Sequence, residues 1–351
     1  MSLQKPCPDC ETGLESIDRR GFLKTAGAAA IATAAVPAFG QSVASGQTGV
    51  SNPEKTPETL VKQLYDSLNE RQNKAICFDW DHVDPRRGLL RTRVAANWMI
   101  TEPQIISNFY TKDQQEIIRG IFEGIYHPDW IPKIEKQLKD DAGGYGRDQT
   151  IAIFGKPGED KFEFVMTGRH MTVRCDGNST ESMAFGGPIF YGHAAGSFDE
   201  GKDHPGNVYW PQALEANKVY KMLDGQQRRQ ALVTRRPAEN AVAFRGANAK
   251  RPGISIADFS DDQKEQVQKT LQSMLQAYRS SDQKEALGCL KEQGGLDACN
   301  LAFYQEGDTG DDQVWDNWRI EGPSFVWYFR GSPHVHVWVN IGTDPSIKLN
   351  A

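Results

Sequence analysis

Aromatic and β-branched runs near the C-terminal end, joined by short turns, constrain the fold of this chain more than any other feature. Ser324–Phe329 and His334–Val339 are separated only by Arg330–Pro333, and Trp318–Ile320 precedes them. Residues of these types favour strands, and so short a connection favours antiparallel pairing of the runs that it joins. The C-terminal segment therefore predicts an antiparallel, aromatic-rich sheet.

A second hairpin is expected in the middle of the chain. The apolar runs Thr150–Gly155 and Lys161–Gly168 flank the turn residues Pro157–Gly158, and His170–Cys175 continues as a further strand. The strand signals gather in these two regions and do not alternate regularly with helical ones. A doubly wound parallel sheet is therefore not expected, and the pattern indicates an α+β fold.

Helix-start signals precede the amphipathic segments of the rest of the chain. Thr56 and Pro57 suit the N-cap and the first position of a helix. Thr111 and Gln114 have the spacing of a capping box, and apolar residues follow them at helical intervals. Similar openings, each ending in glutamine, begin further expected helices at residues 224–227, 260–263 and 280–283.

One large domain is expected, with helical segments packed on antiparallel sheet or hairpins. It covers residues 56–345, with a helical N-terminal part over 56–145 and a mixed core over 149–345. Eight Trp, ten Tyr and sixteen Phe supply a core of that size. The formal net charge of −6 disfavours nucleic-acid binding, because neutralising phosphates needs a basic excess.

The N-terminal segment reads as an export signal. Asp18–Lys24 contains the pair Arg19 and Arg20 followed by Gly-Phe-Leu-Lys, which matches the twin-arginine consensus, and Thr25–Val50 is Ala-rich and uncharged. Residues 1–45 are therefore expected to be a signal peptide and lead-in that engage the twin-arginine machinery. The expected location is the periplasm or cell envelope, with membrane contact only through this segment; a short transmembrane anchor is the alternative.

Histidines supply the candidate chemistry. His334 and His336 are two apart on an expected strand, so their imidazoles point to the same face. If the strand beginning at His170 lies beside the C-terminal hairpin, three imidazoles meet, and such a set can bind Zn, Cu or Fe. The alternatives are a solvated strand face for the first two residues and a capped core histidine for the third.

A glycine-rich stretch supplies two further candidates. Residues 185–207 have the length and composition of an active-site lid, and His193 or His204 would then be a fourth ligand or a general base. A polar connecting loop is the alternative. Cys289 and Cys299 can close a short disulfide loop in an oxidising compartment or remain free buried thiols.

Three of these motifs resemble the DUF3500 family of exported, uncharacterised bacterial proteins. The resemblance lies in Phe164–Thr172, in the helix around Leu223–Leu232, and in Ile320–Phe325 with His334–Trp338. It implies that His170, His334 and His336 lie on the characteristic strands of the family, and it implies no established activity. Two positions depart from the family pattern: Arg169 replaces a histidine, and Trp327 and Tyr328 stand where an acidic residue is common.

Two functions remain open at this point. The first is an exported metal-binding protein, or a metal-dependent enzyme, that acts on a small or polymeric ligand outside the cytoplasm. The second is a metal-free binding or scaffold protein of the envelope. Its ligand surface would be formed by aromatic residues that are otherwise expected to lie in the core, namely Trp210, Trp315, Trp318, Trp327 and Trp338.

Overall fold

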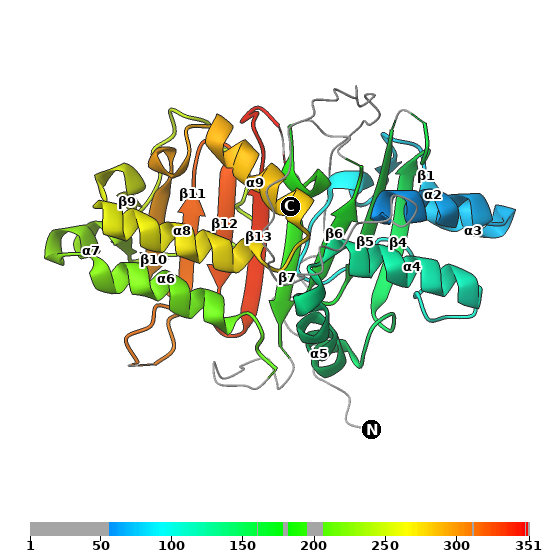
Figure 1. Ribbon diagram of the computed structural model, residues 1–351, viewed down its shortest axis with the longest axis horizontal. Helices are drawn as coiled ribbons and strands as arrows, with labels where there is room; N and C mark the ends of the chain where they lie inside the picture. Colours follow the sequence, from blue (N-terminus) through cyan, green and yellow to red (C-terminus); the bar gives the residue numbers. More distant parts are fainter. Residues whose placement is uncertain are drawn as a thin grey trace, which may run out of the picture.

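The computed structural model describes residues 56–159, 161–177, 182–194, 206–310, 312–347 and 349. These residues form a single α+β domain in which helices pack on one large sheet, as expected from the sequence (Figure 1). The twin-arginine segment and His204 lie outside the described residues. Within the described part of the chain, no helix has the length and apolar character needed to cross a membrane.

The sheet has eleven strands within the described residues, and its long path runs β1-β4-β5-β6-β7-β13-β12-β11-β10-β8, with β9 paired to β10. The two pairs that involve β1 and β8 are parallel, and the other pairs are antiparallel. Two further strands, β2 (Val83–Asp84) and β3 (Gly88–Leu89), form a separate hairpin. The sheet strands are β1 (Cys77–Phe78), β4 (Gln149–Gly155), β5 (Phe162–Gly168), β6 (Met171–Cys175), β7 (Ile189–His193), β8 (Leu232–Val233), β9 (Ile254–Ser255), β10 (Asn300–Tyr304), β11 (Asn317–Glu321), β12 (Phe325–Arg330) and β13 (Val335–Ile341).

The helices begin largely where the sequence predicts. Thr56 caps the first helix with Pro57 at its first position, and the Thr111–Gln114 capping box is complete. The last helix begins at Ser280, but its N-cap is Arg279, which makes no side-chain capping bond. The helices are α2 (Pro57–Ser67), α3 (Glu70–Ile76), α4 (Lys112–Ile125), α5 (Ile131–Ala142), α6 (Trp210–Met222), α7 (Gly225–Ala231), α8 (Asp261–Leu275) and α9 (Ser280–Glu292).

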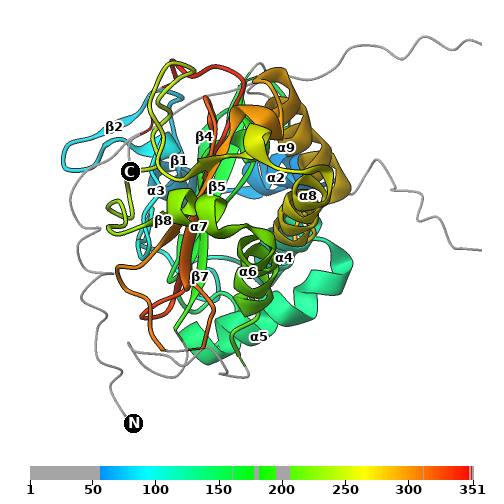
Figure 2. The ribbon, with the colours of Figure 1, turned by 90° about the vertical axis from the view of Figure 1, so that its left-hand side faces the viewer.

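The two faces of the sheet are covered differently. The larger helices lie against one face, and extended segments cover the other (Figure 2). Val337 and Val339 of β13 face the helices, whereas Trp338 packs with residues of the extended segments such as Val94 and Val242. Because alternate residues of a central strand enter two different cores, β13 is buried along its whole length.

The domain consists of two halves with the same order of elements. In the first half, α2, α3 and β1 precede α4, α5 and the four strands β4–β7. In the second, α6, α7 and β8 precede α8, α9 and the four strands β10–β13. Each half places its short first strand parallel to the first strand of its own meander. A half-turn in the plane of Figure 1 carries the helices of one half approximately onto those of the other.

The strand register fixes the centre of this internal symmetry. Tyr191 pairs with Met171 in the first half as Ile341 pairs with Phe325 in the second. Ile189 is therefore the counterpart of Val339, and these two residues pair directly where β7 meets β13. The pseudo-two-fold axis of the molecule therefore passes through the Ile189–Val339 pair at the centre of the sheet.

A pair of hydrogen-bonded glutamines repeats in the two halves. Gln72 Nε2 donates to Gln114 Oε1 at 2.8 Å, and Gln263 Nε2 donates to Gln227 Oε1 at 2.8 Å in the other half. Each of the four glutamines is the third residue of its helix and completes a capping box there. In each half, the two glutamine side chains therefore join two helix N-termini. Each side chain also accepts a hydrogen bond from the backbone N–H of its own N-cap residue.

One expectation about the middle of the chain is corrected, and one of two alternatives near its end is found in the structure. Residues 185–193 are not part of a lid loop, because Ile189–His193 forms the buried central strand β7. The flanking glycines suggested a loop, although the apolar run between them suits a strand that is covered on both faces. Cys289 and Cys299 are free buried thiols in the structure, and no disulfide joins them.

Candidate metal centre

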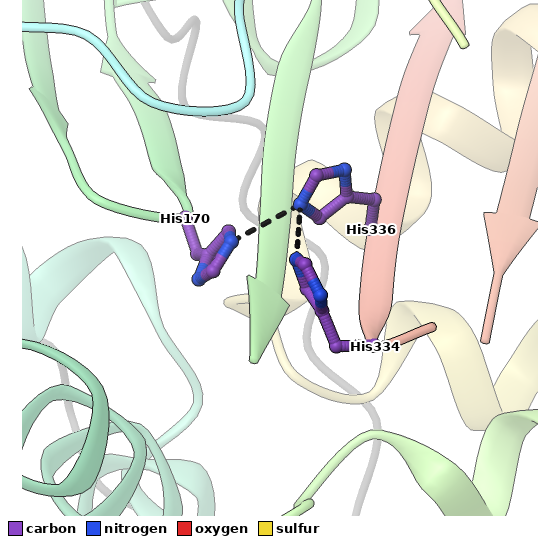
Figure 3. Close-up of side chains that lie close together, drawn as sticks. All are labelled: His170, His334 and His336. Atoms are coloured by element: carbon purple, nitrogen blue, oxygen red, sulfur yellow. Dashed lines mark hydrogen bonds between the residues drawn. The ribbon is translucent and has the colours of Figure 1, made fainter. Parts of the chain in front are cut away.

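Three histidines from two strand ends meet beside β7. His334 and His336 lie at the start of β13 and project to the same face, as their spacing predicts. His170 ends the turn between β5 and β6, on the other side of β7, and its ring reaches across that strand (Figure 3). The expected proximity of the three imidazoles is thus present in the structure, although β7 lies between the strands that carry them.

The ring nitrogens converge closely. The Nε2 atom of His336 lies 3.1 Å from His170 Nε2 and 2.9 Å from His334 Nε2. One ligand nitrogen from each ring lies within 4.8 Å of the other two. All three side chains are buried, with relative exposures of 1%, 1% and 0% for His170, His334 and His336. The group is therefore shielded from bulk water and is not a solvated strand face.

Gly192 makes room for this arrangement. It pairs with His336 across the β7–β13 ladder, so a side chain there would point to the face that carries the imidazole. A Cβ atom at this position would lie 2.2 Å from the carbonyl oxygen of Val335 and 3.3 Å from His170 Cδ2. The absence of a side chain therefore lets the ring of His170 pass over β7 to reach β13.

The backbone of His170 adopts a conformation that is uncommon for this residue type. Its φ is +51°, in the left-handed region, and it closes the two-residue connection between Gly168 and Met171. Its backbone N–H donates to the carbonyl of Ala96 at 3.1 Å. Such a conformation costs on the order of 1–3 kcal/mol and persists where the surroundings hold it, often at functional sites.

Two carboxylates fix the orientation of two of the rings. Asp141 Oδ2, in the last turn of α5, lies 2.5 Å from His170 Nδ1. Glu239 Oε2, in a turn between β8 and β9, lies 2.6 Å from His336 Nδ1. An ionised carboxylate can only accept, so Nδ1 carries the hydrogen and donates it, and in the neutral ring the lone pair is on Nε2. In both residues that lone pair points into the centre of the group.

Arginine side chains balance these carboxylates. Arg169 Nε donates to Asp141 Oδ1 at 2.8 Å. The Nη1 atom of Arg330 lies 2.7 Å from Glu239 Oε1, and Nη1 of Arg236 is 3.9 Å from the same oxygen. Arg169 therefore supports the aspartate that orients His170. The buried carboxylates are therefore paired, as buried charges must be.

Burial and these arginines disfavour protonation of the rings. Burial lowers the pKa of His170 below its usual value, although Asp141 opposes that effect. Burial lowers the pKa of His336 well below its usual value, and the positive charge of Arg330 adds to the decrease. Burial opposes the ionisation of Asp141, but interactions with His170 and Arg169 outweigh it and hold its pKa below the usual range.

The geometry fits a metal ion at the centre of the group. With two Nε2 lone pairs facing each other at 3.1 Å, the neutral rings repel unless a cation lies between them. Nitrogen ligands at 2.0–2.1 Å from a tetrahedral ion are about 3.3 Å apart, close to the observed separations. Carboxylate–histidine pairs are also the usual second shell of a histidine-bound metal. His170, His334 and His336 are therefore the residues that could hold such an ion.

The other candidate residues do not join this group in the described structure. His193 pairs with Val335, one residue away from His336, so strand alternation directs it to the helix-covered face of the sheet. His204 lies outside the described residues. Trp318, Trp327 and Trp338 are buried, with relative exposures of 0%, 0% and 4%. They therefore form no aromatic ligand surface on the C-terminal sheet.

Several residues of the site carry no signal that sequence reasoning could have used. Asp141 lies beside Asp140 in the last turn of α5, where the sequence does not set it apart, and Glu239 lies in a segment without periodicity. Gly192 belonged to a stretch interpreted as a loop. Glu239, which contacts His336, comes from a distant part of the chain.

The chain was compared with known proteins in three ways. A family model described as a protein of unknown function, DUF3500, matches residues 51–340. Neither the search of curated proteins nor the search of solved structures found a match. The matched range includes the three histidines as well as Asp141, Gly192 and Glu239.

Proposed function

The chain belongs to the DUF3500 family of proteins of unknown function, and from that premise we propose that it is an exported metal-binding protein. In this proposal His170, His334 and His336 hold one divalent transition-metal ion, Zn, Cu or Fe. These metals accept imidazole ligands readily. An ion with three protein ligands keeps a position for water or substrate, and it supplies Lewis-acid or redox chemistry. The protein is then a candidate metal-dependent enzyme with a small or polymeric extracytoplasmic substrate.

The orientation of the ring nitrogens carries this proposal. Asp141 and Glu239 hold the Nδ1 protons of His170 and His336, which leaves both Nε2 lone pairs facing the same point. A core histidine that serves only for packing has no need of a carboxylate on one nitrogen and a second imidazole on the other. The charges, the tautomers and the room provided by Gly192 are all consistent with a bound cation.

Metal analysis of protein folded in the cytoplasm and purified without a histidine tag tests the proposal. We expect about one transition-metal ion per chain, and loss of that ion in His336→Ala and in His334→Ala. His127→Ala is the matched control, because that side chain lies apart from the group on the helix layer and is partly exposed. Circular dichroism shows that each variant is folded. Wild-type protein that remains metal-free after exposure to Zn, Cu and Fe would refute the proposal.

Export through the twin-arginine route is part of the same proposal. The route carries folded proteins, so a metal can be acquired before export. Replacing Arg19 and Arg20 by lysine is expected to retain the protein in the cytoplasm, whereas Lys5→Gln, outside the motif, is expected to have no effect on export. Cell fractionation measures the distribution, and normal export of the double-lysine variant would contradict this part of the proposal.

A further inference from the structure

The two ends of the sheet have corresponding folds but different charges. α7 and β8 lie at one end of the molecule, and α3 and β1, the corresponding elements of the first half, lie at the other (Figure 1). Residues 216–238, which include α7 and β8, contain six lysines and arginines and one acidic residue, Asp224, which caps α7. Two of the six pair with acidic side chains, Lys218 with Glu215 and Arg236 with Glu239. The whole chain has a formal net charge of −6, so this stretch has a net charge opposite in sign to that of the chain.

The other four basic side chains are exposed and form no ion pair with another residue that the structure describes. They are Lys221, Arg228, Arg229 and Arg235, here called the basic cluster. Arg228 holds the end of α6 against α7, because its Nη2 atom donates to the carbonyl oxygen of Lys221 at 2.7 Å. Arg235 lies two residues after β8, which itself follows α7 without a break. The basic cluster therefore lies at the end of the molecule that faces the viewer in Figure 2.

The corresponding end of the first half shows that the fold does not require this charge. Asp66 lies two residues before the C-cap of α2, and Lys221 lies two residues before the C-cap of α6. Lys74 and Arg229 occupy the same place in α3 and α7, two residues after the glutamine of the capping box. Lys74, however, pairs with Glu70 at 2.6 Å. The basic excess is therefore specific to the α7 end, which indicates a role outside the packing of the domain.

An exposed apolar side chain accompanies the basic cluster. Met222, the last residue of α6, is 41% exposed and follows Lys221 directly, whereas the corresponding residue of α2 is Ser67. Basic and apolar side chains together are typical of protein surfaces that lie on a bilayer. The apolar groups enter the boundary between headgroups and acyl chains, and the charges attract anionic lipids. A soluble polyanion would be attracted by the same arginines but would make no use of Met222.

We infer that the basic cluster and Met222 form a docking surface for a membrane that contains anionic phospholipids. The cluster supplies the attraction to the headgroups, and Met222 adds a shallow apolar contact. This contact with a membrane is additional to the one expected of the export signal. Because the three histidines lie beside the central strand pair, a molecule docked by its α7 end would hold them away from the bilayer.

Sedimentation with lipid vesicles tests the inference on the full chain. One set of vesicles contains equal parts of phosphatidylcholine and phosphatidylglycerol, and the other contains phosphatidylcholine alone. At low ionic strength we expect saturable binding to the first set and much weaker binding to the second. Added salt is expected to release the protein, because it screens the attraction. Equal binding to both sets, or no binding to either, would overturn the inference.

Two double variants locate the charge that attracts the membrane. Arg229→Gln combined with Arg235→Gln is expected to weaken binding to the anionic vesicles about thirtyfold, since each basic residue near such a surface contributes roughly a factor of five. Arg71→Gln combined with Lys74→Gln makes the same change of charge on α3, at the other end of the molecule, and is expected to have little effect. The N-terminal segment is identical in all these proteins, so a difference between them reports the α7 end. Equal binding by the two double variants would contradict the assignment to the basic cluster.

Met222→Ser distinguishes a bilayer from a soluble polyanion. The substitution is expected to weaken binding to the anionic vesicles severalfold, because the apolar contact is lost, and to leave binding to heparin, a soluble polyanion, unchanged. Vesicle binding that is unaffected by Met222→Ser, together with heparin bound as tightly as the vesicles, would assign the surface to soluble polyanions and refute the inference about the membrane.

Discussion

At the scale of single residues, the proposed centre depends on atoms that would never touch the ion. Asp141 and Glu239 determine which nitrogen of His170 and His336 carries the proton, and Arg169 and Arg330 form ion pairs with those carboxylates. His334 and His336 could be paired from their spacing, because alternate residues of a strand share a face. The carboxylate partners of His170 and His336 come from distant segments, which no local pattern reveals.

Replacing Glu239 by glutamine tests this second shell. The amide group can donate to His336 Nδ1, which favours the tautomer whose Nε2 carries the proton and cannot bind a metal. The metal affinity of Glu239→Gln is expected to fall about 10–100-fold, as measured by competition with a chelator. Glu159→Gln, on the exposed hairpin, should bind metal like the wild type. An unchanged affinity in Glu239→Gln would show that the carboxylate does not support the site.

At the scale of elements, the site depends on the missing side chain of Gly192 in β7. This strand passes between the strands that carry the ligands, and only a glycine at position 192 allows the imidazoles to meet over it. The sequence predicted both hairpins and most helix starts, because those depend on local turns and caps. It did not predict β7, since the pairing of β6 and β13 with this strand is set by contacts far apart in the chain.

Gly192→Ala is expected to disturb both the sheet and the site. The new Cβ would lie 2.2 Å from the carbonyl oxygen of Val335, so the backbone of β7 or β13 must shift. We expect a loss of about 2 kcal/mol or more in the free energy of unfolding, together with weaker metal binding. Chemical denaturation and metal analysis measure the two effects.

Gly288→Ala serves as the matched control for that substitution. Gly288 lies inside α9, and a Cβ there would meet no atom within 4 Å. Because alanine favours a helix more than glycine does, this variant should gain about 0.5–1 kcal/mol. If Gly192→Ala were equally well tolerated, the role assigned to Gly192 would be wrong.

The α9 helix also carries a group whose ionisation opposes folding. Burial raises the pKa of Glu285 to about 7, and the nearby Asp282 adds to the increase. The folded state then binds this proton more tightly than the unfolded state, so the stabilising contribution is present below pH 4.5 and is lost as the pH rises through 7.

Glu285→Gln is expected to remove that dependence. The glutamine can still accept the hydrogen bond that the carboxylate receives from the backbone N–H of Phe185 at 3.0 Å. Relative to wild type, the variant should be more stable by about 2 kcal/mol at pH 8 and nearly equal at pH 4.5. Urea unfolding at the two pH values measures the difference. Glu292→Gln, near the end of the same helix, should show no such change, and a gain independent of pH in Glu285→Gln would contradict this account.

At the scale of the whole molecule, the two halves form one continuous sheet, and the site lies beside its central strand pair. The first half supplies His170 and Asp141, and the second supplies His334, His336 and Glu239. The sequence indicated the α+β class and a single domain, because hairpin and cap signals are local. The repetition of the two halves was not recognised, since it resides in the order and register of elements more than in identical residues.

Metal binding should therefore stabilise the domain as a whole. An ion that binds only the folded state adds about 2.7 kcal/mol at a free concentration one hundred times the dissociation constant. We expect Zn²⁺ to raise the thermal midpoint of metal-free protein and to leave a variant with all three histidines replaced by alanine unchanged. Calorimetry measures both midpoints, and an equal rise in the variant would show that the ion acts elsewhere.

The pseudo-two-fold axis at the Ile189–Val339 pair has a consequence for the ancestry of the chain. Ser324 ends the β11–β12 turn as His170 ends the β5–β6 turn. Gln293 accepts from the backbone N–H of Ser324, and Asp141 contacts the ring of His170. A gene that was duplicated and fused would first have encoded two equivalent chemical positions, one of which was later replaced by uncharged residues. Homologues that retain histidine and aspartate at both positions would preserve the earlier state.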